Sequence, residues 1–332
     1  MEGCPKRMVH GPCGGVRADL TCEIAPHPCP FAQSPEPVRW PGPTAHPDPP
    51  SRLSAALGTG RAVLTDLTVP PFDAEAVAGV TEGLRDSADA LLVGEHQNRP
   101  DFAPALMARL VRDAGGNPWI TLACRDRSRQ VLEQDLGSIR LAGADGVLCV
   151  TGDGRLPGSP GASTPVFDLD GTRLAALATS YGVGVAVAES PDAPPRALRP
   201  ARLVEKQRAG AQLAVLNHAG SAEDVAVFLA AAREAGLRIP VVASVAVYSD
   251  AASARVLQVL PGLRLDAARV TRVVRAPDPE VAGVEAAVGE ALAMLAVPGV
   301  AGVNLSGMDS SRGELPAAAL KAEIGRRIRE AT

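Results

Sequence analysis

The sequence lacks the features that would point to a membrane or to nucleic acid. Its longest apolar runs are far shorter than the roughly 20 residues of a membrane-spanning helix, and its N-terminus has no apolar core typical of a signal peptide. The net charge is -4, and no basic stripe is present. We therefore expect a cytoplasmic protein that binds neither a membrane nor nucleic acid.

Aromatic residues are also scarce, at 3% of the chain, whereas Ala, Gly and Val are abundant. Small side chains suit tightly packed layers of strands and helices. The hydrophobic content of 46% and the charged content of 21% are those of an ordinary globular protein. With 332 residues the chain is long enough for one large domain and an appendage.

The cysteines are few and unevenly placed. Four of the six lie before residue 30, with the spacing C-x8-C-x8-C-x6-C and without a CxxC pair: Cys4, Cys13, Cys22 and Cys29. In a cytoplasmic protein such a cluster favours a metal over disulfides. We expect these thiolates to hold one metal centre, either zinc or an iron–sulfur cluster. A disordered segment with incidental cysteines is the alternative.

A proline-rich stretch separates this segment from the rest. Residues 30 to 50 contain eight prolines, which exclude a helix or a central strand and are typical of an extended linker. We therefore place a Cys-rich metal-binding segment at 1–30, a linker at 31–50 and a large domain at 51–332.

The large domain alternates short apolar runs with amphipathic segments of helical length. Eight strands are expected, at Ala62–Val69, Ala90–Gly94, Trp119–Cys124, Gly146–Thr151, Val183–Ala188, Gln212–Asn217, Pro240–Val247 and Val300–Leu305. Helices are expected between them, with a last one at Ala317–Glu330. Eight βα repeats predict an α/β fold of the (β/α)8 TIM-barrel type. The first strand is not followed by G-x-G-x-x-G, which argues against a dinucleotide-binding Rossmann domain.

Polar residues follow nearly every expected strand. Active sites of such barrels lie at the carboxyl ends of the strands, so these residues are the candidates for chemistry. They are Asp66, Glu95, Asp126, Thr151-Gly152-Asp153, Glu189, Asn217-His218 and Asn304. A histidine such as His218 can titrate near neutral pH, although a lone histidine at a strand end is more often structural.

The stretch Val147–Asp170 combines TGD, a Gly- and Pro-rich loop and VFDLD, and it resembles the methylenetetrahydrofolate reductase family. Two further strings agree in their order. Ala123-Cys124-Arg125-Asp126-Arg127 is similar to the family's third-strand motif, and Lys206 begins KQRAGA, which is similar to its KxxAGA turn. The N-terminal CPKRMVHGPCGGV…CE…C resembles the cysteine-rich domain linked to some of these reductases. The resemblance covers residues 60 to about 310, with a separate match at 4–29.

The resemblance implies reduction of 5,10-methylenetetrahydrofolate to 5-methyltetrahydrofolate by a bound flavin, FAD or FMN. It implies that Asp66 is the catalytic acid, although Asp66 stands one residue further from Pro70-Pro71 than the family's glutamate. Asp153 would lie between flavin and pterin as a catalytic and substrate-binding residue. Asn217 replaces the family's substrate-binding glutamine. Glu95 is a further candidate for substrate contact, and the cofactor would be held by Thr151, Gly152, Asp126 and Lys206.

Electrons would come from NAD(P)H or, through an iron–sulfur cluster, from a reduced protein partner. We also expect a homo-oligomer. Two alternatives stay open. One is a flavin-free folate-dependent one-carbon enzyme, because Thr121 stands where some members have a flavin-contacting histidine and the acid is displaced. The other is a non-catalytic iron–sulfur electron-transfer partner.

Overall fold

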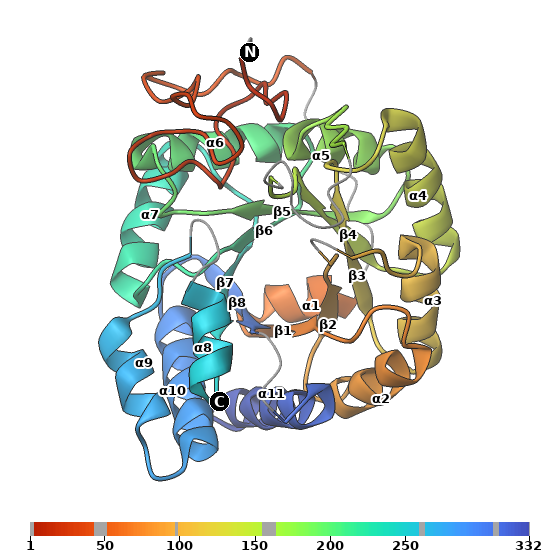
Figure 1. Ribbon diagram of the computed structural model, residues 1–332, viewed down its shortest axis with the longest axis vertical. Helices are drawn as coiled ribbons and strands as arrows, with labels where there is room; N and C mark the ends of the chain where they lie inside the picture. The colour runs from red at the N-terminus through yellow and green to blue at the C-terminus, as the bar shows by residue number, and fades with distance from the viewer. Residues whose placement is uncertain are drawn as a thin grey trace.

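Eight parallel strands close into a barrel in the computed structural model, which describes residues 3–42, 52–96, 99–154, 164–258, 263–307 and 312–331. Each strand pairs with the next along the chain, and β8 pairs with β1 (Figure 1). The strands are β1 Ala62–Leu67, β2 Ala90–Val93, β3 Pro118–Ala123, β4 Gly146–Val150, β5 Gly184–Glu189, β6 Leu213–Leu216, β7 Val241–Ala246 and β8 Val300–Ser306. The predicted TIM barrel is confirmed.

Helices surround the barrel on its outside (Figure 1). They are α2 Ala74–Leu84, α3 Pro104–Asp113, α4 Arg129–Leu141, α5 Gly171–Thr179, α6 Arg199–Arg208, α7 Ala222–Glu234, α8 Ala251–Gln258, α10 Pro279–Leu295 and α11 Glu314–Glu330. Ser and Asp side chains cap several of them; Asp73, Asp170 and Ser221, for example, accept hydrogen bonds from backbone N–H groups of the first turn. In the described part of the chain no helix is long and apolar enough to cross a membrane.

Side chains alternate between the two faces of each strand, so the hydrophobic core has an outer and an inner part. One set of side chains packs outward against the helices, and the other fills the barrel. The inward set includes Leu64, Leu92, Trp119, Leu148, Ala186, Val215 and Val242. A residue two positions further along a strand points the same way, so this register decides which strand-end residues face the barrel mouth.

Two helices and a short 3₁₀ turn were not expected from the sequence. Leu53 of α1 (Arg52–Gly58) is fully buried and packs with the inward side chains, so α1 closes the amino-terminal end of the barrel. α9 (Ala267–Val274) begins at the cap Asp266 and is rich in β-branched residues, which made its helical character hard to see. The 3₁₀ turn η1 spans Arg196–Leu198.

The N-terminal segment, residues 3–42, contains no helix or strand and lies against the α5 and α6 side of the barrel (Figure 1). A small core holds it together: Met8, Val16, Cys29 and Phe31 are buried. Backbone groups tie it to the barrel, since Val9 N–H donates to Asp170 and Trp40 N–H donates to Glu205. Residues 43–50 of the expected linker lie outside the described residues.

Truncation of the α1 plug provides a test of the packing. We expect Leu53→Ala to lower the free energy of unfolding by about 2–5 kcal/mol, because it leaves a cavity in a dry core. Leu141→Ala is the matched control, since Leu141 is 89% exposed and its loss should change the stability by no more than about 0.5 kcal/mol. Urea denaturation measures both, and equal effects would contradict the assignment of α1 as a plug.

Candidate functional site

The carboxyl end of the barrel contains two adjoining cavities. The first, the mouth cavity, has a volume of about 310 Å³ and is lined by Asp66, Thr121, Asn217, Ser244 and Asn304 among others. The second, the side cavity, has a volume of about 360 Å³ and extends toward the N-terminal segment. Gly94, Glu95, Thr121, Leu148, Ala188 and Asn217 line both, so the two spaces adjoin.

Strand parity explains why the mouth cavity is polar. Asp66, Thr121, Asn217 and Ser244 each follow an inward apolar residue by two positions, so they point into the barrel above its dry core. Asn304 Nδ2 donates to Asp66 Oδ1 at 2.9 Å, which orients the carboxylate. Lys321 Nζ donates to the backbone oxygens of Asp66 and Gly307, and holds the ends of β1 and β8 together.

The Thr151-Gly152-Asp153 turn after β4 lines the side cavity. Two features of the Gly152 position favour glycine: its φ is +91°, which other residues rarely adopt, and a Cβ there would lie only 2.9 Å from Arg125 Cβ. Thr151 Oγ1 accepts from the N–H of Gly171 at 2.9 Å, which ties the turn to α5. Lys6 Nζ donates to the Gly152 oxygen at 2.7 Å from the N-terminal segment.

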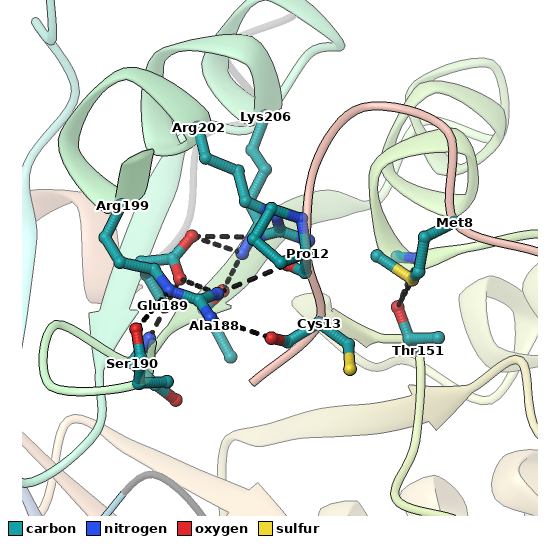
Figure 2. Close-up of polar contacts among 12 residues, drawn as sticks. Met8, Pro12, Cys13, Thr151, Ala188, Glu189, Ser190, Arg199, Arg202 and Lys206 are labelled. Atoms are coloured by element: carbon teal, nitrogen blue, oxygen red, sulfur yellow. Dashed lines mark hydrogen bonds and ion pairs between the residues drawn. The ribbon is translucent and has the colours of Figure 1, made fainter. Parts of the chain in front are cut away.

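A buried charge cluster forms part of the wall of the side cavity (Figure 2). The carboxylate of Glu189, at the end of β5, is 2.8 Å from Arg202, 2.9 Å from Lys206 and 3.4 Å from Arg199. The three cations stand at i, i+3 and i+7 on α6 and therefore share one helix face. Arg199 also donates to the backbone oxygens of Pro12 and Cys13, so the cluster binds the N-terminal segment as well.

The cluster shifts the pKa of its members. Burial alone would raise the pKa of Glu189, but the charges of Lys206, Arg202 and Arg199 lower it to about 2. Burial, with the charge of Arg202, lowers the pKa of Lys206 to about 7 against the opposing effect of Glu189. The Lys206 ammonium donates to the Ala188 oxygen at the cavity wall. A lysine in this position can gain or lose a proton near neutral pH.

Glu95 and Asp126 are held by neighbouring arginines. Arg127 Nη1 is 2.8 Å from Glu95 and its Nε is 2.8 Å from Asp135, while Glu95 also accepts from the N–H of Ala123. Asp126 pairs with Arg125 at 2.9 Å. Ser128 caps α4, since its side chain accepts the bond from Val131 N–H. Both acids line a further, outer cavity of about 560 Å³ beside β2 and β3.

The structure brings most of the predicted site residues together. Thr151, Gly152, Asp153, Lys206, Glu95 and Asn217 line the side cavity, and Asp66 lines the adjoining mouth cavity. Asp126 lines the outer cavity, which shares Gly94, Glu95 and Thr121 with the other two cavities and therefore adjoins them. His218 does not titrate near neutral pH, because burial lowers its pKa to about 4. Neither ring nitrogen of His218 has a geometric hydrogen-bond partner within the described residues.

The cysteines of the N-terminal segment gather without forming a compact ligand set. Cys4, Cys13 and Cys29 pack in its small core. Burial raises the pKa of Cys29, and the charges of Cys13, Cys4 and Cys22 raise it further, so the four lie within electrostatic range. Of all His, Cys, Asp and Glu side chains in the described ranges, no three are arranged to hold a metal ion. The metal site stays a prediction.

Sequence reasoning missed several residues of the site. Lys6, Arg202 and Ser190 line the side cavity, and Arg199 completes the cluster behind it. The helical spacing of Arg199, Arg202 and Lys206 was a visible signal of a basic face. Lys6 had no such signal, because only the folded chain places it against β4.

The sequence matches no protein-family model and no curated protein. Solved structures do share the fold. A protein of unassigned function from Clostridium thermocellum that binds two copies of 5-methyl-5,6,7,8-tetrahydrofolic acid has a TM-score of 0.55 at 13% identity, covering 82% of this chain and 98% of its own. Tryptophan synthase from M. tuberculosis has a TM-score of 0.47 at 14% identity, covering 84% of this chain and 99% of its own. Oxaloacetate acetylhydrolase has a TM-score of 0.46 at 13% identity, covering 80% of this chain and 81% of its own.

Removal of the buried carboxylate should be costly. We expect Glu189→Gln to lower the free energy of unfolding by about 3–5 kcal/mol, because three cations lose their partner in a dry site. Glu133→Gln is the control: Glu133 forms an exposed i,i+4 pair with Arg129, worth about 0.3–0.5 kcal/mol. Thermal unfolding at neutral pH compares the two variants, and a small loss in Glu189→Gln would show that the cluster does not stabilise the fold.

Because of the Glu189 carboxylate, the free energy of unfolding should decrease as the pH falls into the acid range. Its folded pKa of about 2 lies below the unfolded value of about 4.3, so the unfolded state binds more protons in between. Its contribution is complete above about pH 4.3 and is lost as the pH falls toward 2. Unfolding free energies measured along this range should fall less steeply for Glu189→Gln; parallel curves would contradict the assignment.

Proposed function

We propose that the protein is a folate-binding TIM-barrel enzyme, and specifically a methylenetetrahydrofolate reductase-like oxidoreductase. The observation that carries this proposal is that Asp66, Glu95, Asp153 and Asn217, separated widely in sequence, line two adjoining cavities at the barrel mouth. The folate-bound Clostridium thermocellum protein has a similar fold and supports a folate as the ligand class. The reductase chemistry rests on the resemblance of the sequence motifs.

In this proposal the pterin lies between Asp153 and Asn217. A carboxylate accepts hydrogen bonds from paired N–H donors such as those of the pterin edge, and an amide supplies both a donor and an acceptor. Asn217 is already oriented, since its Nδ2 donates to Ser190 Oγ at 3.0 Å and its backbone N–H donates to the backbone oxygen of Glu189. Glu95 borders the same space and would bind a polar part of the substrate.

Asp66 is the proposed acid. It protonates the ring nitrogen of 5,10-methylenetetrahydrofolate, the five-membered ring opens, and the exocyclic methylene accepts a hydride. Asp66 suits this role because it points into the mouth cavity and Asn304 fixes its Oδ1 by a hydrogen bond. Asp66 lies on the inward face of β1, since it follows Leu64 by two positions.

A flavin would supply the hydride, and we propose that its phosphates lie beside the basic side chains of the side cavity, Lys6, Arg125, Arg202 and Lys206. Glu95, Asp153 and Glu189 line the same cavity. Lys206 and the Thr151–Gly152 backbone would contact the cofactor from this cavity, and Asp126 from the adjoining outer cavity.

The cysteine segment is proposed to hold an iron–sulfur cluster. Four thiolates within 26 residues, separated by Gly and Pro, supply the four ligands that such a cluster needs, and the same four thiolates would also suit zinc. Cys13 lines the side cavity, so a centre bound here would border the flavin site. The electron donor is then a reduced protein partner, with NAD(P)H as the alternative.

Absorbance and metal analysis of protein purified without oxygen are the first test. We expect a flavin band near roughly 450 nm together with iron and sulfide, and formation of 5-methyltetrahydrofolate when reductant is added. Zinc without flavin would favour a flavin-free folate-dependent one-carbon enzyme. Iron without any turnover of folate would favour a non-catalytic electron-transfer partner.

The role of Asp66 has its own test. We expect Asp66→Asn to lower kcat by about 10²–10⁴-fold, because it removes the proton donor, while the Kd for 5-methyltetrahydrofolate changes little. Asp86→Asn is the control, since this exposed carboxylate lies between α2 and β2, at the opposite end of the barrel. Steady-state kinetics and calorimetric binding separate the two effects. A variant of Asp66 with normal kcat would rule out Asp66 as the acid.

A further inference from the structure

Lysine is rare in this chain, and its placement is selective. The sequence contains 33 basic residues, of which only Lys6, Lys206 and Lys321 are lysines. All three lysines are buried, whereas many of the arginines lie on the surface. A lysine provides a compact ammonium with three donors, while the planar guanidinium of arginine is suited to carboxylates.

Each lysine donates to backbone oxygens at the carboxyl end of the barrel. Lys206 Nζ binds the Ala188 oxygen in β5, and Lys321 Nζ binds the oxygens of Asp66 in β1 and Gly307 just after β8. Lys6 Nζ binds the Gly152 oxygen just after β4. The lysines therefore share one task, which is to hold strand ends where the cavities open. Lys6 performs it from outside the barrel.

Lys6 is well fixed in this position. Its side chain is 3% exposed, and its ammonium forms an ion pair with Glu23 of the same segment. It also lies 5.9 Å from the centre of the Phe167 ring. Lys6, Cys13 and Gly14 line the side cavity together with Asp153, whose charge acts on Lys6. One wall of the cavity thus comes from the N-terminal segment.

We propose that the N-terminal segment is an integral wall of the ligand site and that Lys6 is the positioning residue of the Gly152–Asp153 turn. Gly152 has a left-handed backbone, which directs its carbonyl oxygen at Lys6. With this oxygen held, Asp153 presents its carboxylate to the cavity in one orientation. Ligand binding at Asp153 then depends on a residue that lies 146 positions away from Gly152 in the sequence.

The test compares Lys6→Met with Arg7→Met in the full chain. Methionine keeps the length of the side chain but removes the ammonium. Arg7 is the control because its side chain is 65% exposed and forms an exposed 4.0 Å ion pair with Asp168, a kind of contact that contributes little, while its backbone oxygen accepts from Arg173. Two measurements are made: hydrogen exchange of the Gly171 amide, which donates to Thr151 Oγ1, and calorimetric binding of 5-methyltetrahydrofolate.

We expect Lys6→Met to accelerate exchange at Gly171 about tenfold or more and to raise the Kd about tenfold or more, the loss typical of a hydrogen bond from a charged group. Arg7→Met should stay within about twofold of the wild type in both. Wild-type exchange in Lys6→Met, or equal effects of the two variants, would overturn the proposal. The choice of ligand rests on the proposed function, but the exchange result does not. Faster exchange in a protein that never binds folate would therefore support the positioning role and reject the folate.

Detachment of the whole segment is detected by fluorescence. The Trp40 and His10 ring centres lie 5.1 Å apart, and the backbone N–H of Trp40 donates to the Glu205 carboxylate. The emission of Trp40 therefore reports whether the segment is bound to the barrel. If Lys6→Met shifts this emission, Lys6→Arg is measured as well, because arginine retains both the charge opposite Glu23 and N–H donors for the Gly152 oxygen. We expect Lys6→Arg to keep the Trp40 emission and to bring exchange at Gly171 back to within about twofold of the wild type. Exchange as fast as in Lys6→Met, with the emission unshifted, would overturn the proposal.

Discussion

The buried carboxylate of Glu189 is the interaction on which the site depends. It ends β5, binds three cations of α6, and through Arg199 reaches the backbone of Pro12 and Cys13 (Figure 2). A buried charge without partners is strongly destabilising, so β5 and α6 stabilise one another through this cluster, and Arg199 extends the contact to the N-terminal segment. The barrel wall and the segment that borders the cavity are thereby coupled through one side chain.

This coupling decides how the N-terminal segment relates to the barrel. It has a small core and hydrogen bonds of its own, and several polar contacts join it to the barrel: Asp170 accepts from Val9, Gly152 from Lys6 and Glu205 from Trp40. Cys13 consequently lines the side cavity beside the strand ends. In the proposed function, this proximity is what allows a metal centre to pass electrons to a flavin in the side cavity.

Much of the barrel could be predicted from the sequence because its signals are local. Apolar runs separated by amphipathic stretches mark the eight strands, and polar residues at strand ends mark Asp66, Glu95, Asp153 and Asn217. α1 could not be predicted in its role, because seven residues carry little periodicity and the burial of Leu53 depends on the closed barrel. For His218 the sequence favoured a structural role, and its burial agrees; only the fold shows that this burial lowers its pKa to about 4.

The sequence by itself determined the fold class, since hydrophobic periodicity and turn residues act over a few neighbours and repeat eight times. It also determined which residues stand at the strand ends. Only the tertiary structure decided which of them share a cavity, because strand parity turns Asp66 and Asn217 into the mouth cavity while Asp126 lines the adjoining outer cavity. Only the folded chain brings Lys6 to Gly152. Contacts between residues so far apart arise from closure of the barrel and burial of charge, which no local pattern encodes.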